Sequence, residues 1–182
     1  MMHSVYFLMA MHAHQPVGNF DSVLDQAYRT AYEPFLGVLE RHPNVRVNLH
    51  YSGSLLDWVT EHRPAFINRV ARLVKQGQVE LLASGYYEPI LPIIPEPDRQ
   101  EQIRLMRRTL KRTFGAEAAG AWLTERVWEP ELPQTLAAAG IAYTMLDTNQ
   151  FRAAQSVLPR ELQLEDRDGW EVLGSYVTGY GE

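Results

Sequence analysis

The segment Ala121-Trp-Leu-Thr-Glu-Arg-Val-Trp-Glu-Pro-Glu131 decides how the rest of this chain is interpreted. A predicted helix precedes it, and the prolines Pro130 and Pro133 are typical of the start of another helix. Residues 120–124 are therefore predicted to form a buried strand between two helices. Glu125 falls where that strand ends and a loop begins, which is where parallel α/β proteins place their catalytic groups.

The residue types around Glu125 point to sugar chemistry. A carboxylate attacks or stabilises the oxocarbenium-like centre that forms when a glycosidic bond breaks. The indole rings of Trp122 and Trp128 are flat and apolar, so they can lie against the faces of pyranose rings. The alternative interpretation of this segment is structural, with Glu125 and Arg126 in a charge network and the tryptophans as core anchors.

Composition restricts the function classes. The 182 residues are 46% hydrophobic and carry a formal net charge of −5, which predicts one domain with one core. There is no cysteine, so disulfides, a thiol nucleophile and a cysteine metal site are excluded. The mild acidity without runs of Lys or Arg argues against nucleic acid and anionic membranes as partners. No stretch resembles a signal peptide or a membrane span, which favours a cytoplasmic protein.

Hydrophobic patterns divide the chain into five βα-like units. The predicted strands are residues 5–11, 45–50, 79–83, 120–124 and 141–146. The predicted helices are residues 21–40, 54–76, 97–114 and 130–139. Pro34 and Pro64 are expected to kink or break the first two helices. Such a series implies a parallel sheet, either open and doubly wound or the front part of a (β/α) barrel. Residues 162–176 are predicted to form a β-hairpin.

Four short motifs lie at the beginnings or ends of the predicted strands. They are His14-Gln-Pro16, Gly77-Gln-Val-Glu80, Gly85-Tyr-Tyr-Glu-Pro89 and Trp122-Leu-Thr-Glu-Arg-Val-Trp128. In order and spacing they resemble the motifs of glycoside hydrolase family 57, in its branch of 4-α-glucanotransferases and α-amylases. The resemblance extends from about residue 5 to about residue 151. It implies that residues 1–182 are the N-terminal portion of one catalytic domain, an incomplete (β/α)7 barrel whose remaining strands are absent.

The resemblance also implies a substrate and a mechanism. Family members act on α-1,4-glucans or maltooligosaccharides by a retaining mechanism, without a metal or another cofactor. Glu125 matches the nucleophile of the family, and His14, Glu80 and Trp122 match residues that line the sugar subsite. Five further residues, in or next to these motifs, are expected to contact the sugar: His12, Gln15, Tyr86, Glu88 and Trp128.

A retaining mechanism needs a second carboxyl group about 5–5.5 Å from the nucleophile, which protonates the leaving oxygen. In the family this acid is an aspartate on a later strand, within an acidic segment that Gly follows. This sequence contains no such segment. We therefore expect the chain to hold the nucleophile half of the site, and to be inactive unless Asp147 or Glu88 substitutes for the acid.

Two other functions stay open at this point. His12 and His14 form a His-x-His pair whose side chains share one face of a strand, as in a metal-dependent hydrolase, and His50 could add a ligand. The chain could also be a non-catalytic carbohydrate-binding remnant, because one carboxylate and several aromatic side chains suffice to bind a sugar. The sequence specifies neither the oligomeric state nor the balance between hydrolysis and transfer.

Overall fold

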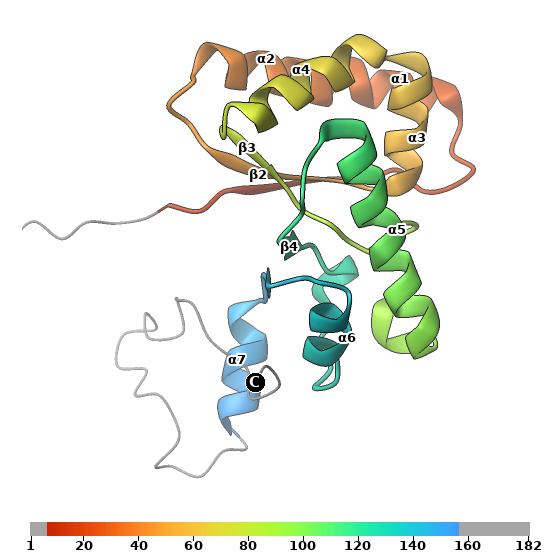
Figure 1. Cartoon of the computed structure of the whole chain (residues 1–182), viewed down its shortest axis with the longest axis vertical. Coiled ribbons are helices and arrows are strands. Elements are labelled where there is room, and N and C mark those ends of the chain that lie inside the picture. Colours follow the sequence, from red (N-terminus) through yellow and green to blue (C-terminus); the bar gives the residue numbers. More distant parts are fainter. Residues whose placement is uncertain (1–6, 157–182) are drawn as a thin grey trace, which may run out of the picture.

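The computed structural model describes residues 7–156 and shows an α/β protein whose paired strands are parallel (Figure 1). The strands are β1 (Ala10–Ala13), β2 (Val47–Tyr51), β3 (Val79–Leu81), β4 (Gly120–Ala121) and β5 (Tyr143–Thr144). β1, β2 and β3 form one sheet in that order, and β4 pairs with β5. A bridge between Ala83 and Ala121 connects the two sheets, so the strands follow one another in chain order. The predicted series of parallel βα units is confirmed.

Helices connect the strands. They are α1 (Asp21–Ala27), α2 (Glu33–Arg41), α3 (Gly53–His62), α4 (Pro64–Lys75), α5 (Glu96–Phe114), α6 (Leu132–Ala138) and α7 (Thr148–Ser156). A π-helical segment (Tyr28–Tyr32) and two 3-10 turns (Leu91–Ile93 and Thr124–Arg126) complete the described elements. In Figure 1, α2 and α4 lie together on one side of β2 and β3. Within residues 7–156, no helix combines the length and the apolarity that crossing a bilayer requires.

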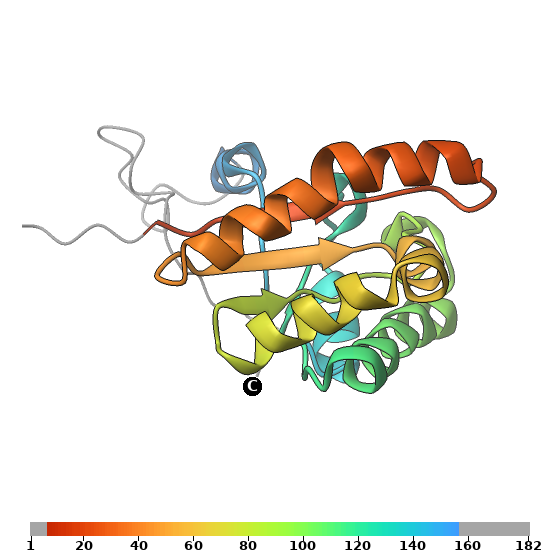
Figure 2. The ribbon, with the colours of Figure 1, turned by 90° about the horizontal axis from the view of Figure 1, so that it is seen from above.

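The core lies between the sheet and the helices on that side. Alternation along β2 turns the buried side chains of Val47, Leu49 and Tyr51 toward the helices. The facing stripe of α4 has apolar residues at three- and four-residue spacing: Phe66, Ile67, Val70 and Leu73. Figure 2 shows α4 and α5 side by side along this layer. Burial of each such side chain contributes about 1.5–3 kcal/mol, so packing of helices on the sheet stabilises these short strands.

The first predicted helix is interrupted, but the interruption lies before Pro34 and not at it. Hydrogen bonding changes to the wider π pattern over Tyr28–Tyr32, between α1 and α2. The ring of a proline clashes with the carbonyl four residues earlier, which here belongs to Thr30, and a wider turn relieves that clash. The second predicted interruption is confirmed, because α3 ends at His62 and α4 begins at Pro64.

Other boundaries also differ from the predicted ones. β1 begins at Ala10 and not at residue 5, and β4 and β5 have two residues each. β4 is short because the chain turns into a 3-10 segment at Thr124, before the predicted strand would end. α7 has no counterpart among the predicted helices, because its sequence is mostly polar and lacks an apolar stripe. The predicted hairpin at 162–176 lies outside the described residues.

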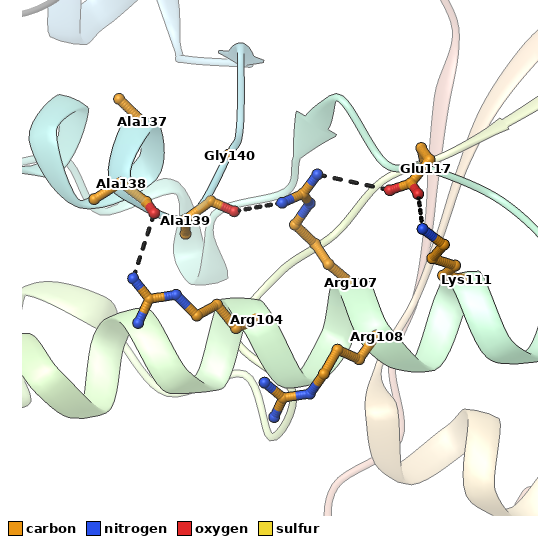
Figure 3. A pocket seen from close by; sticks show the side chains of 9 residues that line it. All are labelled: Arg104, Arg107, Arg108, Lys111, Glu117, Ala137, Ala138, Ala139 and Gly140. Carbon is orange, nitrogen blue, oxygen red and sulfur yellow. Dashed lines mark hydrogen bonds and ion pairs between the residues drawn. The ribbon is translucent and has the colours of Figure 1, made fainter.

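Arginines of α5 hold the end of α6 (Figure 3). The Arg107 guanidinium donates to the Ala139 carbonyl (Nη1–O 2.7 Å), and Arg104 donates to the Ala138 carbonyl (Nη2–O 3.4 Å). The C-terminal carbonyls of a helix lack intrahelical partners and carry partial negative charge, so cations stabilise them. Gly140 follows with φ 77°, and the Arg107 side chain occupies the place of a Cβ atom there. These contacts fix the turn that leads from α6 into β5.

A three-way ion pair joins α2 to α4. The Arg69 guanidinium on α4 donates to both carboxylate oxygens of Glu40 (Nε–Oε1 3.0 Å and Nη2–Oε2 2.7 Å). It also donates to Glu33 at the other end of α2 (Nη1–Oε1 2.5 Å). The hydrogen bonds from Arg69 hold the pKa of Glu40 below its ordinary value of 4.5. One guanidinium therefore ties both ends of α2 to the helix beside it.

Replacing Arg69→Met should lower the free energy of unfolding at pH 7 by about 1 kcal/mol, because partly exposed ion pairs are screened by water. The pKa of Glu40 is depressed in the folded protein, so its contribution is present above pH 4.5 and is lost as the pH falls through the folded pKa. Urea unfolding at pH 7 and at acidic pH measures the difference between variant and parent. Arg41→Met, an exposed position on α2, is the control. A difference that persists undiminished in acid would contradict this role.

Candidate active site at the strand ends

The polar face of the sheet is the side turned away from α2 and α4. Near the start of the strands it carries a hydrogen-bonded triad of Asn48 (β2), Glu80 (β3) and Tyr143 (β5). The Tyr143 hydroxyl donates to Glu80 (Oη–Oε1 2.6 Å), and the Asn48 amide donates to the other Glu80 oxygen (Nδ2–Oε2 3.1 Å). Burial, and then the bond to Glu80, raise the pKa of Tyr143. Gly120 lies beneath the Tyr143 ring, where a Cβ atom would overlap it.

Three stacked rings form the next layer toward the strand ends. His12 and His50 are register partners on β1 and β2, and one ring nitrogen donates to the other (Nδ1–Nδ1 2.8 Å). The Trp122 indole, just after β4, lies almost parallel to the His12 ring (centroids 4.6 Å apart, 9° between planes). His50 is 1% exposed, whereas His12 is open to solvent. Solvent therefore reaches this stack of rings at His12 and not at His50.

Glu88 is a buried carboxylate at the centre of this end of the sheet. Its Oε2 contacts His14 Nδ1, and its Oε1 lies 3.7 Å from the Nδ1 atoms of both His12 and His50. The Glu88 side chain is 2% exposed. Among the described residues, Oε1 has no hydrogen-bond partner. His12, His50 and Glu88 each offer one atom that could ligate a metal ion, and these atoms lie within 4.8 Å of one another.

The surroundings of the three imidazoles disfavour their protonated form. Burial lowers the pKa of His12, His14 and His50, and for His50 the lowering is large. The neighbouring histidines lower the pKa of His12 and His50 further. The negative charge of Glu125 opposes this lowering at His12 and His14, but the net shift of each pKa stays downward. The structure therefore brings Glu125, predicted to be the nucleophile, to the same end of the sheet as these histidines.

Glu125 itself is exposed on a strained turn. It lies in the 3-10 segment that follows β4, with φ 53°, and the next residue, Arg126, has φ 50°. A left-handed conformation costs a residue with a side chain about 1–3 kcal/mol, so neighbouring contacts must hold the turn. Arg126 pairs with Asp147 (Nε–Oδ1 3.0 Å) and lies over the Trp122 ring. The Gln150 amide donates to the Arg126 carbonyl.

Four other residues that were predicted to contact the sugar lie outside the histidine–glutamate cluster. Tyr86 is a core residue and not an exposed aromatic, because its ring packs on Gly53 and its hydroxyl donates to Asp57 (Oη–Oδ1 2.6 Å). Trp128 is half-buried against the core. The Gln15 side chain donates to the Tyr32 hydroxyl in the π-helical segment (Nε2–Oη 3.2 Å) and accepts from the Asn19 amide in the loop after β1 (Nδ2–Oε1 2.7 Å). Glu80 belongs to the triad with Asn48 and Tyr143, and within residues 7–156 no hydrogen bond or ion pair joins it to the histidines, so its predicted sugar contact stays a prediction.

The structure adds Asn48 and Tyr143, which the sequence motifs do not include, and shows new contacts for His50, Arg126 and Asp147. His50, Asn48 and Tyr143 occupy the polar face, and Arg126 with Asp147 holds the turn at Glu125. The sequence already offered His50 as a possible ligand, and it is the last residue of the strand predicted at residues 45–50. His12 and His14 lie on different oxygens of Glu88, because His14 contacts Oε2 while His12 faces Oε1 and His50.

The fold and the site define an α/β protein of the parallel βα class with a histidine–glutamate cluster at its strand ends. A model of the family described as "Glycosyl hydrolase family 57" matches residues 1–174. The chain belongs to this family.

Three known proteins illustrate the relationship. An "Alpha-amylase" of Pyrococcus horikoshii is 50% identical over 150 residues, a match covering 82% of this chain and 24% of that protein. The crystal structure of a 4-alpha-glucanotransferase from Thermococcus litoralis superposes with a TM-score of 0.77 at 41% identity, over 85% of this chain and 24% of that one. The alpha-amylase AmyC of Thermotoga maritima shares the fold at 16% identity, with a TM-score of 0.67 over 80% of this chain and 40% of its own. The chain spans about a quarter of the length of the curated relatives it matches.

Gly120→Ala tests the packing of the polar face. A methyl group there would overlap the Tyr143 ring, so the triad must shift, and the free energy of unfolding should fall by about 1–3 kcal/mol. Gly37→Ala is the matched control, because that glycine lies inside α2, where its Cβ meets only the mobile end of Arg41. We expect the control to be neutral or slightly stabilising. Equal stability of Gly120→Ala and parent in urea unfolding would contradict the described packing.

Proposed function

We propose that this chain carries the nucleophile part of a retaining active site for α-1,4-glucans, in an incomplete (β/α)7 barrel, with Glu125 as the nucleophile. The observation that carries the proposal is the position of Glu125, an exposed carboxylate on a strained turn at a strand end, close enough to act on His12 and His14. Family membership and relatives named alpha-amylase and 4-alpha-glucanotransferase support the substrate class.

In this proposal a Glu125 oxygen attacks the anomeric carbon while the glycosidic C–O bond breaks. An acid protonates the leaving oxygen and then, as a base, removes a proton from water or from an acceptor sugar. The incoming oxygen displaces Glu125 from the anomeric carbon. Water as the acceptor gives hydrolysis, and a sugar hydroxyl gives transfer to a longer glucan.

The neighbours of Glu125 have distinct roles in binding. The His14 ring is 39% exposed and is anchored at one nitrogen by Glu88, so its second nitrogen can meet a sugar hydroxyl. Trp122 stacks on His12 and is partly exposed, so its remaining indole surface can contact a pyranose ring. Arg126 and Asp147 hold the backbone turn that directs the Glu125 carboxylate.

Neither expected substitute is free to act as the acid. Glu88 is buried and contacts His14, while Asp147 is paired with Arg126. We infer that the acid comes from outside the described residues. A chain without that acid would bind maltooligosaccharides and not cleave them, which is the carbohydrate-binding alternative.

Incubation of the folded chain with maltoheptaose, followed by product analysis, tests turnover. Any activity should fall at least about a thousand-fold in Glu125→Ala, since a lost nucleophile removes the covalent step. Longer products identify transfer. Glu129→Ala, an exposed carboxylate of the same loop, is the control and should retain the parent rate. Activity that survives Glu125→Ala would contradict the assignment.

Binding is measured separately, by the change in tryptophan fluorescence when maltoheptaose is added to Glu125→Gln. We expect Trp122→Leu in that background to weaken binding about ten-fold or more, because a stacked aromatic contributes on the order of 1–3 kcal/mol at a binding site. Trp58→Phe is the control, because the Trp58 indole on α3 is buried and its nitrogen donates to Asp21. A folded chain that shows neither turnover nor binding would overturn the proposed function.

A further inference from the structure

The cluster of His12, His50 and Glu88 has a feature that the proposed function does not use. Glu88 Oε1 belongs to a side chain that is 2% exposed, and it has no hydrogen-bond partner among residues 7–156. A buried carboxylate oxygen normally has a partner, because leaving it bare sacrifices its interaction with water. This oxygen faces two ring nitrogens, the Nδ1 atoms of His12 and His50, at 3.7 Å each.

These three atoms have the spacing of metal ligands. The two nitrogens are 2.8 Å apart, and the oxygen is 3.7 Å from each. A point about 2 Å from all three atoms lies within their triangle, and zinc binds imidazole nitrogen and carboxylate oxygen at about 2.0–2.2 Å. We propose that His12, His50 and Glu88 form a binding site for one divalent transition-metal ion of the Zn²⁺ class.

The donor set favours this class of ion. Two imidazole nitrogens suit zinc and its neighbours, whereas magnesium and calcium prefer oxygen ligands. Two histidines and one glutamate supply three ligands, and an ion that moves out of the plane of these atoms toward the exposed side gains a tetrahedral arrangement with its fourth position open. The His12 side chain is 31% exposed, so the ion and its fourth ligand enter from that side.

Neighbouring contacts hold the ligands in place before an ion binds. His14 contacts Glu88 Oε2, which leaves Oε1 as the oxygen that turns toward the ion. Trp122 stacks on the His12 ring and fixes its plane. Such surrounding contacts commonly change metal affinity by about 10–100-fold. This ligand set differs from the predicted His12/His14 pair, because His14 orients a ligand and is not one.

The site is independent of the proposed function, because metal binding is measured without turnover. Zn²⁺ titration of the full chain by calorimetry should show one ion bound per chain. Co²⁺ added to the same protein should give the strong visible absorption of a tetrahedral site. His12→Gln and Glu88→Gln should each weaken Zn²⁺ binding at least about 100-fold, and His14→Gln about 10–100-fold. His62→Gln, an imidazole on α3 bound to the Trp58 carbonyl, is the control and should bind as the parent does.

Thermal unfolding supplies a second measurement, since an ion that binds only the folded chain raises its Tm. Zn²⁺ should raise the Tm of the parent and of His62→Gln, but not that of Glu88→Gln. Far-ultraviolet circular dichroism establishes that each variant is folded. The proposal is overturned if the folded parent binds no stoichiometric Zn²⁺, if Co²⁺ gives only the weak octahedral spectrum, or if His12→Gln and Glu88→Gln bind like the parent.

Discussion

Parallel strand pairing is the constraint on which the site depends. The register of β1 and β2 sets His12 opposite His50, so both imidazoles reach the same end of the sheet. The parallel bridge between Ala83 and Ala121 brings the segments after β3 and β4 to this same end of the sheet. These segments carry Glu88 and Trp122. Residues from four separate parts of the chain therefore meet because their strands point the same way.

Backbone strain is concentrated where the carboxylates lie. Within the described residues, the amino acids other than glycine with positive φ are Glu88, Glu125 and Arg126. Each lies in a loop after a strand, and side-chain contacts hold each loop: His14 on Glu88, and Asp147 on Arg126. Left-handed turns direct these side chains across the strand ends, which an extended continuation of the strands would not do.

The sequence was sufficient for the order of the βα units and for the place of Glu125 at a strand end. Both follow from hydrophobic periodicity and proline positions, which are local features. The sequence did not predict which aromatic side chains are buried, because burial depends on partners that are distant in the chain. Tyr86 lies in a polar loop, yet Gly53 of α3 leaves room for its ring, and Asp57 accepts a hydrogen bond from its hydroxyl group. The same limit applies to His50, whose importance appears only when β1 supplies His12 beside it.

The two carboxylates at the strand ends have opposite surroundings, and this difference separates their roles. Glu88 is enclosed by imidazoles and its side chain is only 2% exposed, so a leaving group does not reach it. Glu125 is exposed, and its charge acts on the same imidazoles from outside. A nucleophile must be reachable by the anomeric carbon, and Glu125 meets that requirement while Glu88 does not. Glu88 is instead suited to orient histidines, or to hold an ion between them, behind the surface on which a sugar would bind.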